Sequence, residues 1–230
     1  MIRRFKLKIN GESPRSLFLT FVLSKLNCDV YVYNFLSNTG SKEDYQIFSF
    51  FNSTKDLLSK FDIWNEIEDI SYNFTSLIIK DNLVYEELLL RPENFSIKFL
   101  NTIGWSVRYS DLKSLLINKL INSDNVHFVS NNQLIDESFI FDYEFNFKNE
   151  VKISNLFNLS LSTSKRLDQK ILTFNVYLRG HIEKRLYEIN TTKGLLILTP
   201  LNKNLYQITW NNPSSRLIEI SLLSKSFFLD

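Results

Sequence analysis

The chain has 230 residues, of which 44% are hydrophobic and 23% are charged. This balance is typical of a globular protein with a sizeable core, and it excludes a disordered chain. The net charge is only +2, and basic residues alternate with acidic ones along the chain. A nucleic-acid partner is therefore not expected.

The cysteine content and the lengths of the apolar runs bear on the compartment. Cys28 is the only cysteine, which excludes an internal disulfide and is consistent with a reducing environment. The apolar runs are far shorter than the ~18 residues of a membrane span, so no transmembrane segment is expected. We therefore predict a cytoplasmic protein.

The sequence has no alanine and only five glycines. A composition with so few small residues first affects the sites that need the smallest side chains, such as the turns that bind cofactors.

The amino-terminal residues predict a strand, a turn, a helix and a second strand. The strands are predicted at 6–9 and 29–33, the turn at 11–16 and a mainly apolar helix at 17–26. A dinucleotide-binding fold has the pattern Gly-x-Gly-x-x-Gly in such a turn, for a tight bend, close approach to a pyrophosphate and close helix packing. Gly11 fills the first position, and Ser13 and Ser16 fill the other two.

The rest of the chain predicts further helices and a late block of strands. Residues 41–61 have helical spacing, and 111–121 form a clear helix with Leu112, Leu115, Leu116 and Leu120 on one face. The strict alternation of 141–148 predicts a half-exposed antiparallel strand. Further strands are predicted at 75–79, 95–99, 126–129, 172–178, 195–198 and 206–210, and a last helix at 216–229. The fold class predicted is α/β, a Rossmann-like βαβ domain interleaved with a partial antiparallel sheet.

In this order, four stretches resemble the FAD-dependent aromatic hydroxylases of the p-hydroxybenzoate hydroxylase type, and most of all the ubiquinone-biosynthesis hydroxylases of polyprenylated phenols. They are residues 9–33, 57–64, 103–107, and 194–201 together with 209–210. The resemblance implies an FAD-binding-like domain at 1–70 and 101–168. It implies a partial substrate-domain sheet at 71–100 and 169–230, and a chain that corresponds to the front part of a family member.

The chain departs from the family at most positions that would hold the flavin. Ser13 and Ser16 replace two glycines of the family pattern. Asn34 replaces the acidic residue that would bind the ribose, and its uncharged side chain cannot accept a charge-assisted hydrogen bond. The expected flavin-contacting arginine is Gln46, and no Gly-Asp pair occurs in the sequence. The degenerate cofactor positions are therefore Gly11, Ser13, Ser16 and Asn34, and FAD binding is expected to be weak or lost.

No other catalytic apparatus is indicated. The two histidines, His127 and His181, lack the neighbours of a metal site, and no nucleophile motif or phosphate loop is present. We predict neither a catalytic residue nor a metal site.

Three hypotheses follow. The leading one is a truncated, degenerate relative of the ubiquinone-type monooxygenases, with little or no hydroxylase activity and a scaffold or subunit role beside quinone-biosynthesis enzymes. The second is an active FAD-dependent hydroxylase, using NAD(P)H and O2, completed by a missing carboxyl-terminal part. The third is a flavin-free module that binds an apolar phenolic ligand in a pocket lined from residues 172–210. Peripheral association with the inner membrane is left open.

Overall fold

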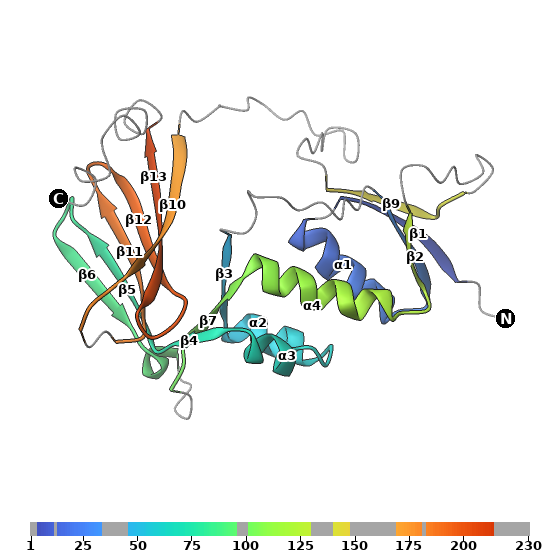
Figure 1. The fold of residues 1–230 in the computed structure, drawn as a ribbon, viewed down its shortest axis with the longest axis horizontal. Coiled ribbons are helices and arrows are strands. Elements are labelled where there is room, and N and C mark those ends of the chain that lie inside the picture. The colour runs from blue at the N-terminus through green and yellow to red at the C-terminus, as the bar shows by residue number, and fades with distance from the viewer. Residues whose placement is uncertain are drawn as a thin grey trace. The chain divides into compact units, whose positions relative to one another are not determined.

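The computed structural model describes residues 4–11, 13–33, 46–95, 101–129, 140–147, 169–180 and 183–213. The chain divides into two units (Figure 1). The first comprises Met1–Gln46, Phe61–Glu66 and Tyr109–Ser164, and the second Ile47–Lys60, Ile67–Arg108 and Lys165–Asp230. The α/β fold class predicted from the sequence is confirmed, with a parallel sheet in the first unit and mainly antiparallel sheets in the second.

The first unit is built on a four-stranded parallel sheet. Its order is β8-β2-β1-β9, where the strands are β1 (Phe5–Asn10), β2 (Cys28–Tyr33), β8 (Val126–Val129) and β9 (Tyr143–Asn146). Counted along the chain, the strands lie in the order third, second, first, fourth. This is the arrangement of a doubly wound dinucleotide-binding fold, in which the strand order reverses beside the first strand.

The alternation at 141–148 did give a strand, but its predicted direction was wrong. β9 runs parallel to β1, with Leu7 opposite Tyr143 and Asn10 opposite Asn146. Alternation reports that one face of a strand is more exposed than the other, and it holds for an edge strand of either direction. The direction is fixed by pairing with β1, which the local sequence does not encode.

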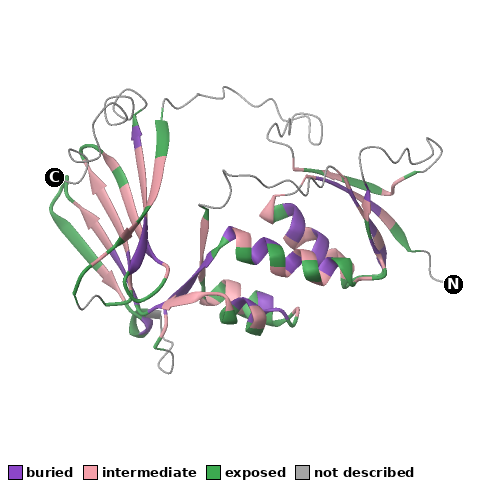
Figure 2. Ribbon diagram, viewed as in Figure 1, coloured by how far each residue is buried: buried purple, intermediate pink, exposed green. Residues whose placement is uncertain are grey.

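Two helices pack against each other, and the first of them also packs against β1 and β2 of this sheet. They are α1 (Pro14–Ser24) and α4 (Tyr109–Ile121). Leu112, Leu116 and Leu120 recur every fourth residue of α4 and are fully buried, as expected for one face of a helix. Figure 2 shows the buried residues of both helices and the parallel strands in purple. Both helices begin earlier than predicted, α1 by three residues and α4 by two.

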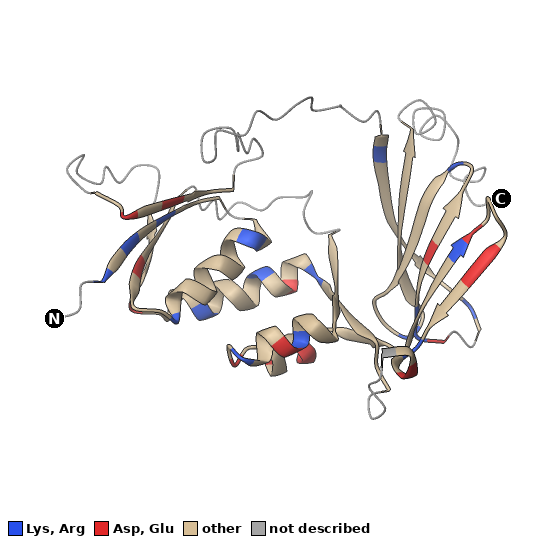
Figure 3. Ribbon diagram, turned by 180° about the vertical axis from the view of Figure 1, so that it is seen from behind, with Lys and Arg blue, Asp and Glu red and all other residues tan. Residues whose placement is uncertain are grey.

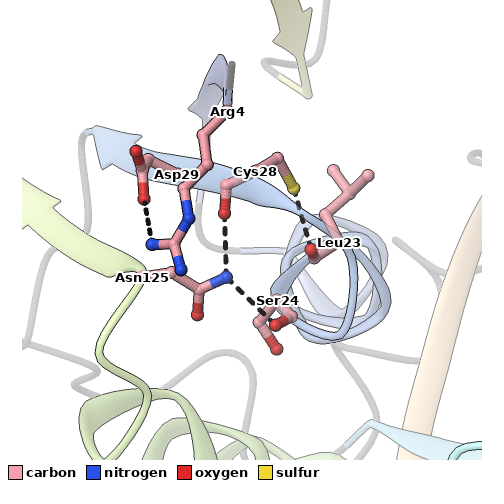
Figure 4. Close-up of polar contacts among 6 residues, drawn as sticks. All are labelled: Arg4, Leu23, Ser24, Cys28, Asp29 and Asn125. Atoms are coloured by element: carbon pink, nitrogen blue, oxygen red, sulfur yellow. Dashed lines mark hydrogen bonds and ion pairs between the residues drawn. The ribbon is translucent and has the colours of Figure 1, made fainter. Parts of the chain in front are cut away.

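A polar junction ties the end of α1 to the starts of β2 and β8 (Figure 4). The amide of Asn125 donates to the carbonyl of Ser24 at 3.0 Å and to that of Cys28 at 2.8 Å. The Cys28 thiol donates to the carbonyl of Leu23 at 2.9 Å. The Asn125 side chain therefore satisfies two backbone carbonyls. It lies where β2 and β8 begin, at the amino ends of the parallel strands.

The second unit contains two sheets. A three-stranded antiparallel sheet has the order β3-β7-β4, with β3 (Ile47–Phe51), β7 (Gly104–Arg108) and β4 (Tyr72–Phe74). The helix predicted over 41–61 is wrong at 47–51, because these residues pair with β7. Helix α2 (Asn52–Ser59) follows, and then α3 (Trp64–Asp69), which crosses the division between the units.

The second sheet has six strands in the order β10-β13-β12-β11-β5-β6. They are β5 (Ser76–Asp81), β6 (Glu86–Leu90), β10 (Gln169–Tyr177), β11 (Arg185–Thr191), β12 (Gly194–Pro200) and β13 (Leu205–Pro213). All pairs are antiparallel except β11 with β5. Four of these strands were predicted, whereas β6 and β11 were missed. The 3-10 turn η1 (Pro92–Phe95) ends a described stretch; the rest of the predicted strand 95–99 and the predicted helix 216–229 lie outside the described residues.

A buried serine links the two sheets of the second unit. The Ser106 hydroxyl of β7 lies 3.1 Å from the carbonyl of Tyr72 in β4 and also contacts the carbonyl of Pro200 in β12. Phe74, Leu77, Ile103 and Leu186 form a buried apolar cluster there. Within the part of the chain that the structure describes, no helix is long and apolar enough to cross a membrane.

Gly104 of β7 should be intolerant of any side chain. A Cβ there would lie 2.4 Å from the Phe74 ring and 2.6 Å from the Phe50 carbonyl. We expect Gly104→Ala to lower the free energy of unfolding by about 2 to 3 kcal/mol, because packed rings and backbone must shift. Urea denaturation measures the change.

Gly180→Ala is the matched control. Gly180 has φ of +98° but no atom within 4 Å of its Cβ position, so only backbone strain of about 1 kcal/mol is expected. Equal costs for the two substitutions would contradict the steric explanation for Gly104.

Candidate dinucleotide site

The first turn of the chain lies where a doubly wound fold binds its ligand. In such sheets the ligand binds at the carboxyl ends of the strands, at the point where the strand order reverses. That point lies between β1 and β9, and the turn from Gly11 to Ser13 leaves β1 there. The structure places Gly11 directly after β1, Ser13 at the amino-terminal cap of α1 and Ser16 in its first turn, and their role as cofactor positions stays a prediction.

Gly11 is needed by the backbone itself. Its φ is +123°, in the region that favours glycine, and an added Cβ would meet the Cβ of Phe147 at 3.2 Å. Its N–H donates to the carbonyl of Tyr33 at 3.1 Å, and the N–H of Phe147 donates to the carbonyl of Asn10 at 2.8 Å. The glycine thus has a structural explanation that requires no cofactor.

Ser13 caps helix α1 with its own side chain. Its hydroxyl oxygen accepts a hydrogen bond from the N–H of Ser16 at 3.3 Å. Pro14 follows as the first helical residue and has no N–H to offer. Among the first three helical residues, Pro14 has no N–H and the N–H of Ser16 is bound to the cap. This leaves the N–H of Arg15 as the one available donor of the three. A glycine-rich turn offers these groups to a pyrophosphate.

Ser16 is fully buried at the position where a glycine would let helix and strand approach. Its hydroxyl folds back onto the turn, 2.7 Å from the carbonyl of Ser13 and 2.9 Å from that of Gly11. Both oxygens are acceptors, so the hydroxyl proton is used inside the protein. Serine is tolerated here because it is small and its polar atom has partners.

A carboxylate lies on the strand beside the turn. Glu144 of β9 accepts a hydrogen bond from the side-chain amide of Asn10 at 2.7 Å and forms an ion pair with Lys8 at 3.1 Å. The same carboxylate oxygen makes both contacts, so β1 and β9 are joined by side chains as well as backbone. The Lys8 ammonium offsets the charge of this carboxylate, so the pair adds little net charge beside the turn.

Aromatic side chains lie on the same face of the sheet as Lys8. Tyr31 lies 4.7 Å from the ring of His127 and 5.5 Å from that of Phe141, and Tyr33 lies 6.0 Å from Phe141. The ammonium of Lys8 lies 5.2 Å from the Tyr33 ring. Burial raises the pKa of the Tyr31 and Tyr33 hydroxyls. His127 therefore packs against a tyrosine within a strand.

The other predicted candidates do not form a reactive group. Asn34 lies outside the described residues, and Gln46 is exposed, with its carbonyl accepting from the N–H of Tyr109 at 2.8 Å. The Cys28 thiol is buried, and desolvation, followed by the nearby charge of Asp29, raises its pKa, which disfavours the reactive thiolate. The described residues include no group of three histidine, cysteine, aspartate or glutamate side chains placed to hold a metal.

Sequence reasoning missed the two residues that decide the character of the turn. It treated Ser13 only as a substituted glycine and did not use Pro14. A Ser-Pro pair before an apolar run is a recognised start signal for a helix, with serine as the cap and proline at the first position. That signal was present in the sequence and would have placed the start of α1 correctly.

Comparisons with known proteins show the fold. No protein-family model and no curated protein matches the sequence. Among solved structures, the chain is similar to PqsL of Pseudomonas aeruginosa, a probable FAD-dependent monooxygenase, with a TM-score of 0.66 over 94% of this chain. It is also similar to the p-nitrophenol 4-monooxygenase PnpA of Pseudomonas putida, with 0.67 over 98%, and to the flavin-dependent halogenase CmlS, with 0.67 over 96%.

These likenesses are structural. The identities are 11%, 11% and 14%, so they show a shared fold and nothing finer. The chain spans 63%, 60% and 44% of the lengths of these proteins. The fold of flavin-dependent monooxygenases is thus established for this chain, whereas specific closeness to the ubiquinone-biosynthesis enzymes stays a prediction.

The cap on α1 can be tested by removing it. Ser13→Ala deletes the acceptor of the Ser16 N–H, and we expect a loss of about 1 kcal/mol in the free energy of unfolding. Ser24→Ala, in the last turn of the same helix, removes a hydroxyl that donates to the Phe21 carbonyl and should cost less than half as much. Urea denaturation compares the two. A Ser13→Ala protein as stable as the wild type would show that the hydroxyl does not cap the helix.

Proposed function

We propose that this protein is a non-catalytic relative of the FAD-dependent aromatic hydroxylases, with a scaffold or subunit role. The observation that carries the proposal is the start of helix α1, where the N–H and the hydroxyl of Ser16 are both hydrogen-bonded to Gly11 and Ser13 within the protein. Fold likeness alone would favour a flavoprotein. The chemistry of the turn favours the opposite conclusion.

The energetic argument rests on the lost donors. Hydrogen bonds from backbone N–H groups to a charged acceptor contribute about 1.5 to 3 kcal/mol each. Pro14 removes one such donor and the Ser13 cap occupies a second. Two lost donors correspond to about 3 to 6 kcal/mol, or roughly two to four orders of magnitude in affinity for a pyrophosphate.

Loss of the flavin would mean loss of the reaction. In flavin monooxygenases the cofactor carries the oxygen chemistry, and the protein supplies binding and orientation. The described residues offer no metal cluster as a substitute, and the only thiol is buried with a raised pKa. We therefore infer little or no hydroxylase activity. The role beside quinone-biosynthesis enzymes rests on the sequence resemblance, and the predicted partner is one of those enzymes.

The first experiment is the visible absorbance spectrum of the freshly purified protein, repeated after incubation with FAD and desalting. We expect a colourless protein in both cases and no rise in melting temperature with FAD, because a ligand that binds the native state must stabilise it. A flavin spectrum retained through desalting would contradict the proposal.

Two matched variants separate specific from adventitious binding if any FAD is retained. Arg15 and Lys25 are both exposed cations of the α1 region, at its first turn and at its carboxyl-terminal cap. Arg15→Gln should weaken FAD only if the pyrophosphate lies at the turn, and Lys25→Gln should then have no effect. Equal effects of both would indicate a general attraction of the anion to positive charge.

The second candidate is an FAD-dependent hydroxylase whose site is completed by residues from outside this segment. It is favoured by the extent of the match, because the neighbouring monooxygenases PqsL and PnpA are longer than this chain by more than a third. It predicts that FAD binds only when a polypeptide carrying a Gly-Asp segment is added. The flavin-free module for an apolar phenolic ligand stays a prediction, and its pocket is expected beside β10 and β13.

A further inference from the structure

The six-stranded sheet of the second unit ends in two strands of very different character. β6 and β10 each have one neighbouring strand in the part of the chain that the structure describes. Proteins usually protect such edges with charges, prolines, bulges or short strands, because the open backbone groups can pair with another chain.

β6 carries this protection and β10 largely lacks it. β6 is five residues long and begins with the exposed Glu86 and Glu87 (Figure 3). β10 is nine residues long, contains no proline, and has Lys170 as its only charge. Its sequence is rich in residues that favour strands, and Ile171 and Tyr177 have 65% and 77% of their surface exposed.

The sequence of β10 is also complementary to itself. In an antiparallel pair of two copies centred on Thr173, Thr173 lies opposite its own copy and Leu172 lies opposite Phe174. Ile171 then faces Asn175, Lys170 faces Val176 and Gln169 faces Tyr177. No like charges meet, and threonine pairs are among the favourable cross-strand contacts. Leu172 and Phe174 would bury apolar surface against each other. A two-fold axis through Thr173 gives a closed, isologous dimer.

We propose that the protein forms a homodimer in which β10 of one copy pairs with β10 of the other, antiparallel and centred on Thr173. The pairing joins two six-stranded sheets into one. A nine-residue strand pair is smaller than a standard interface of about 800 Å² per partner, so the dimer should be weak and dependent on concentration. This inference does not depend on whether FAD binds.

Sedimentation velocity of the full chain between about 1 and 100 μM tests the proposal, because this range brackets a micromolar dissociation constant. We expect a shift from monomer to dimer across it. Thr173→Lys places two ammonium groups together on the axis and should raise the dissociation constant at least tenfold. A mixture of Thr173→Lys and Thr173→Glu proteins should regain the dimer, because opposite charges then meet. Leu88→Lys on β6 is the matched control and should leave the dimer intact.

Thr173→Cys gives an independent test that keeps the side chain small. In the proposed register the two cysteines face each other at a distance that permits a disulfide, so mild oxidation should link two chains. Leu88→Cys should not. A wild-type protein that stays monomeric throughout, a dimer that survives Thr173→Lys, or equal cross-linking at both edges would each overturn the proposal.

Discussion

The first unit depends on the close meeting of helix α1 with strand β1 across one short turn. The chain leaves β1 at Gly11, whose positive φ and contact with Phe147 permit no side chain. It then enters α1 through Ser13 and Pro14, and Ser16 is buried where the helix faces the turn. Each residue is compatible with this geometry because it is small or conformationally fixed and because its polar groups are bonded locally.

The same hydrogen bonds that stabilise the turn limit what it can bind. A helix amino terminus attracts an anion because its N–H groups have no partners in the helix. Here a hydroxyl takes one of them and a proline lacks another. Under the proposed function, stability of the fold and affinity for a pyrophosphate compete for the same groups, and this chain uses them for the fold. The strand order, third-second-first-fourth, is that of a doubly wound dinucleotide-binding fold.

The sequence predicted those features that arise from local pattern. The buried face of α4 and the strands β1, β2 and β8 were predicted because apolar spacing encodes burial directly. The direction of β9 and the strand β3 were not, because both depend on pairing with a distant partner, β1 and β7 respectively. Phe48 and Phe51 are three residues apart and fit a helical spacing, and only the pairing with β7 decides for a strand.

The candidate site followed the same rule. The positions of Gly11, Ser13 and Ser16 could be predicted from spacing, since a strand, a turn and a helix fix where the turn must lie. The pairing of Asn10 with Glu144 could not be predicted, because β9 is more than a hundred residues away along the chain. The direction of the Ser16 hydroxyl could not be predicted either, because residue spacing does not give the conformation of a side chain. The resemblance to flavin hydroxylases indicated where a cofactor would bind. The hydrogen bonds of Ser13 and Ser16 are the reason that we propose weak or no binding there.

The most direct test of this account is an NMR titration of the isotope-labelled protein with FAD, following the backbone amides of Ser16 and Leu17. The account predicts that these signals do not move, because the Ser13 hydroxyl and carbonyl hold these two amides. Saturable shifts concentrated at these two amides would contradict it and would show that the turn opens to receive a pyrophosphate.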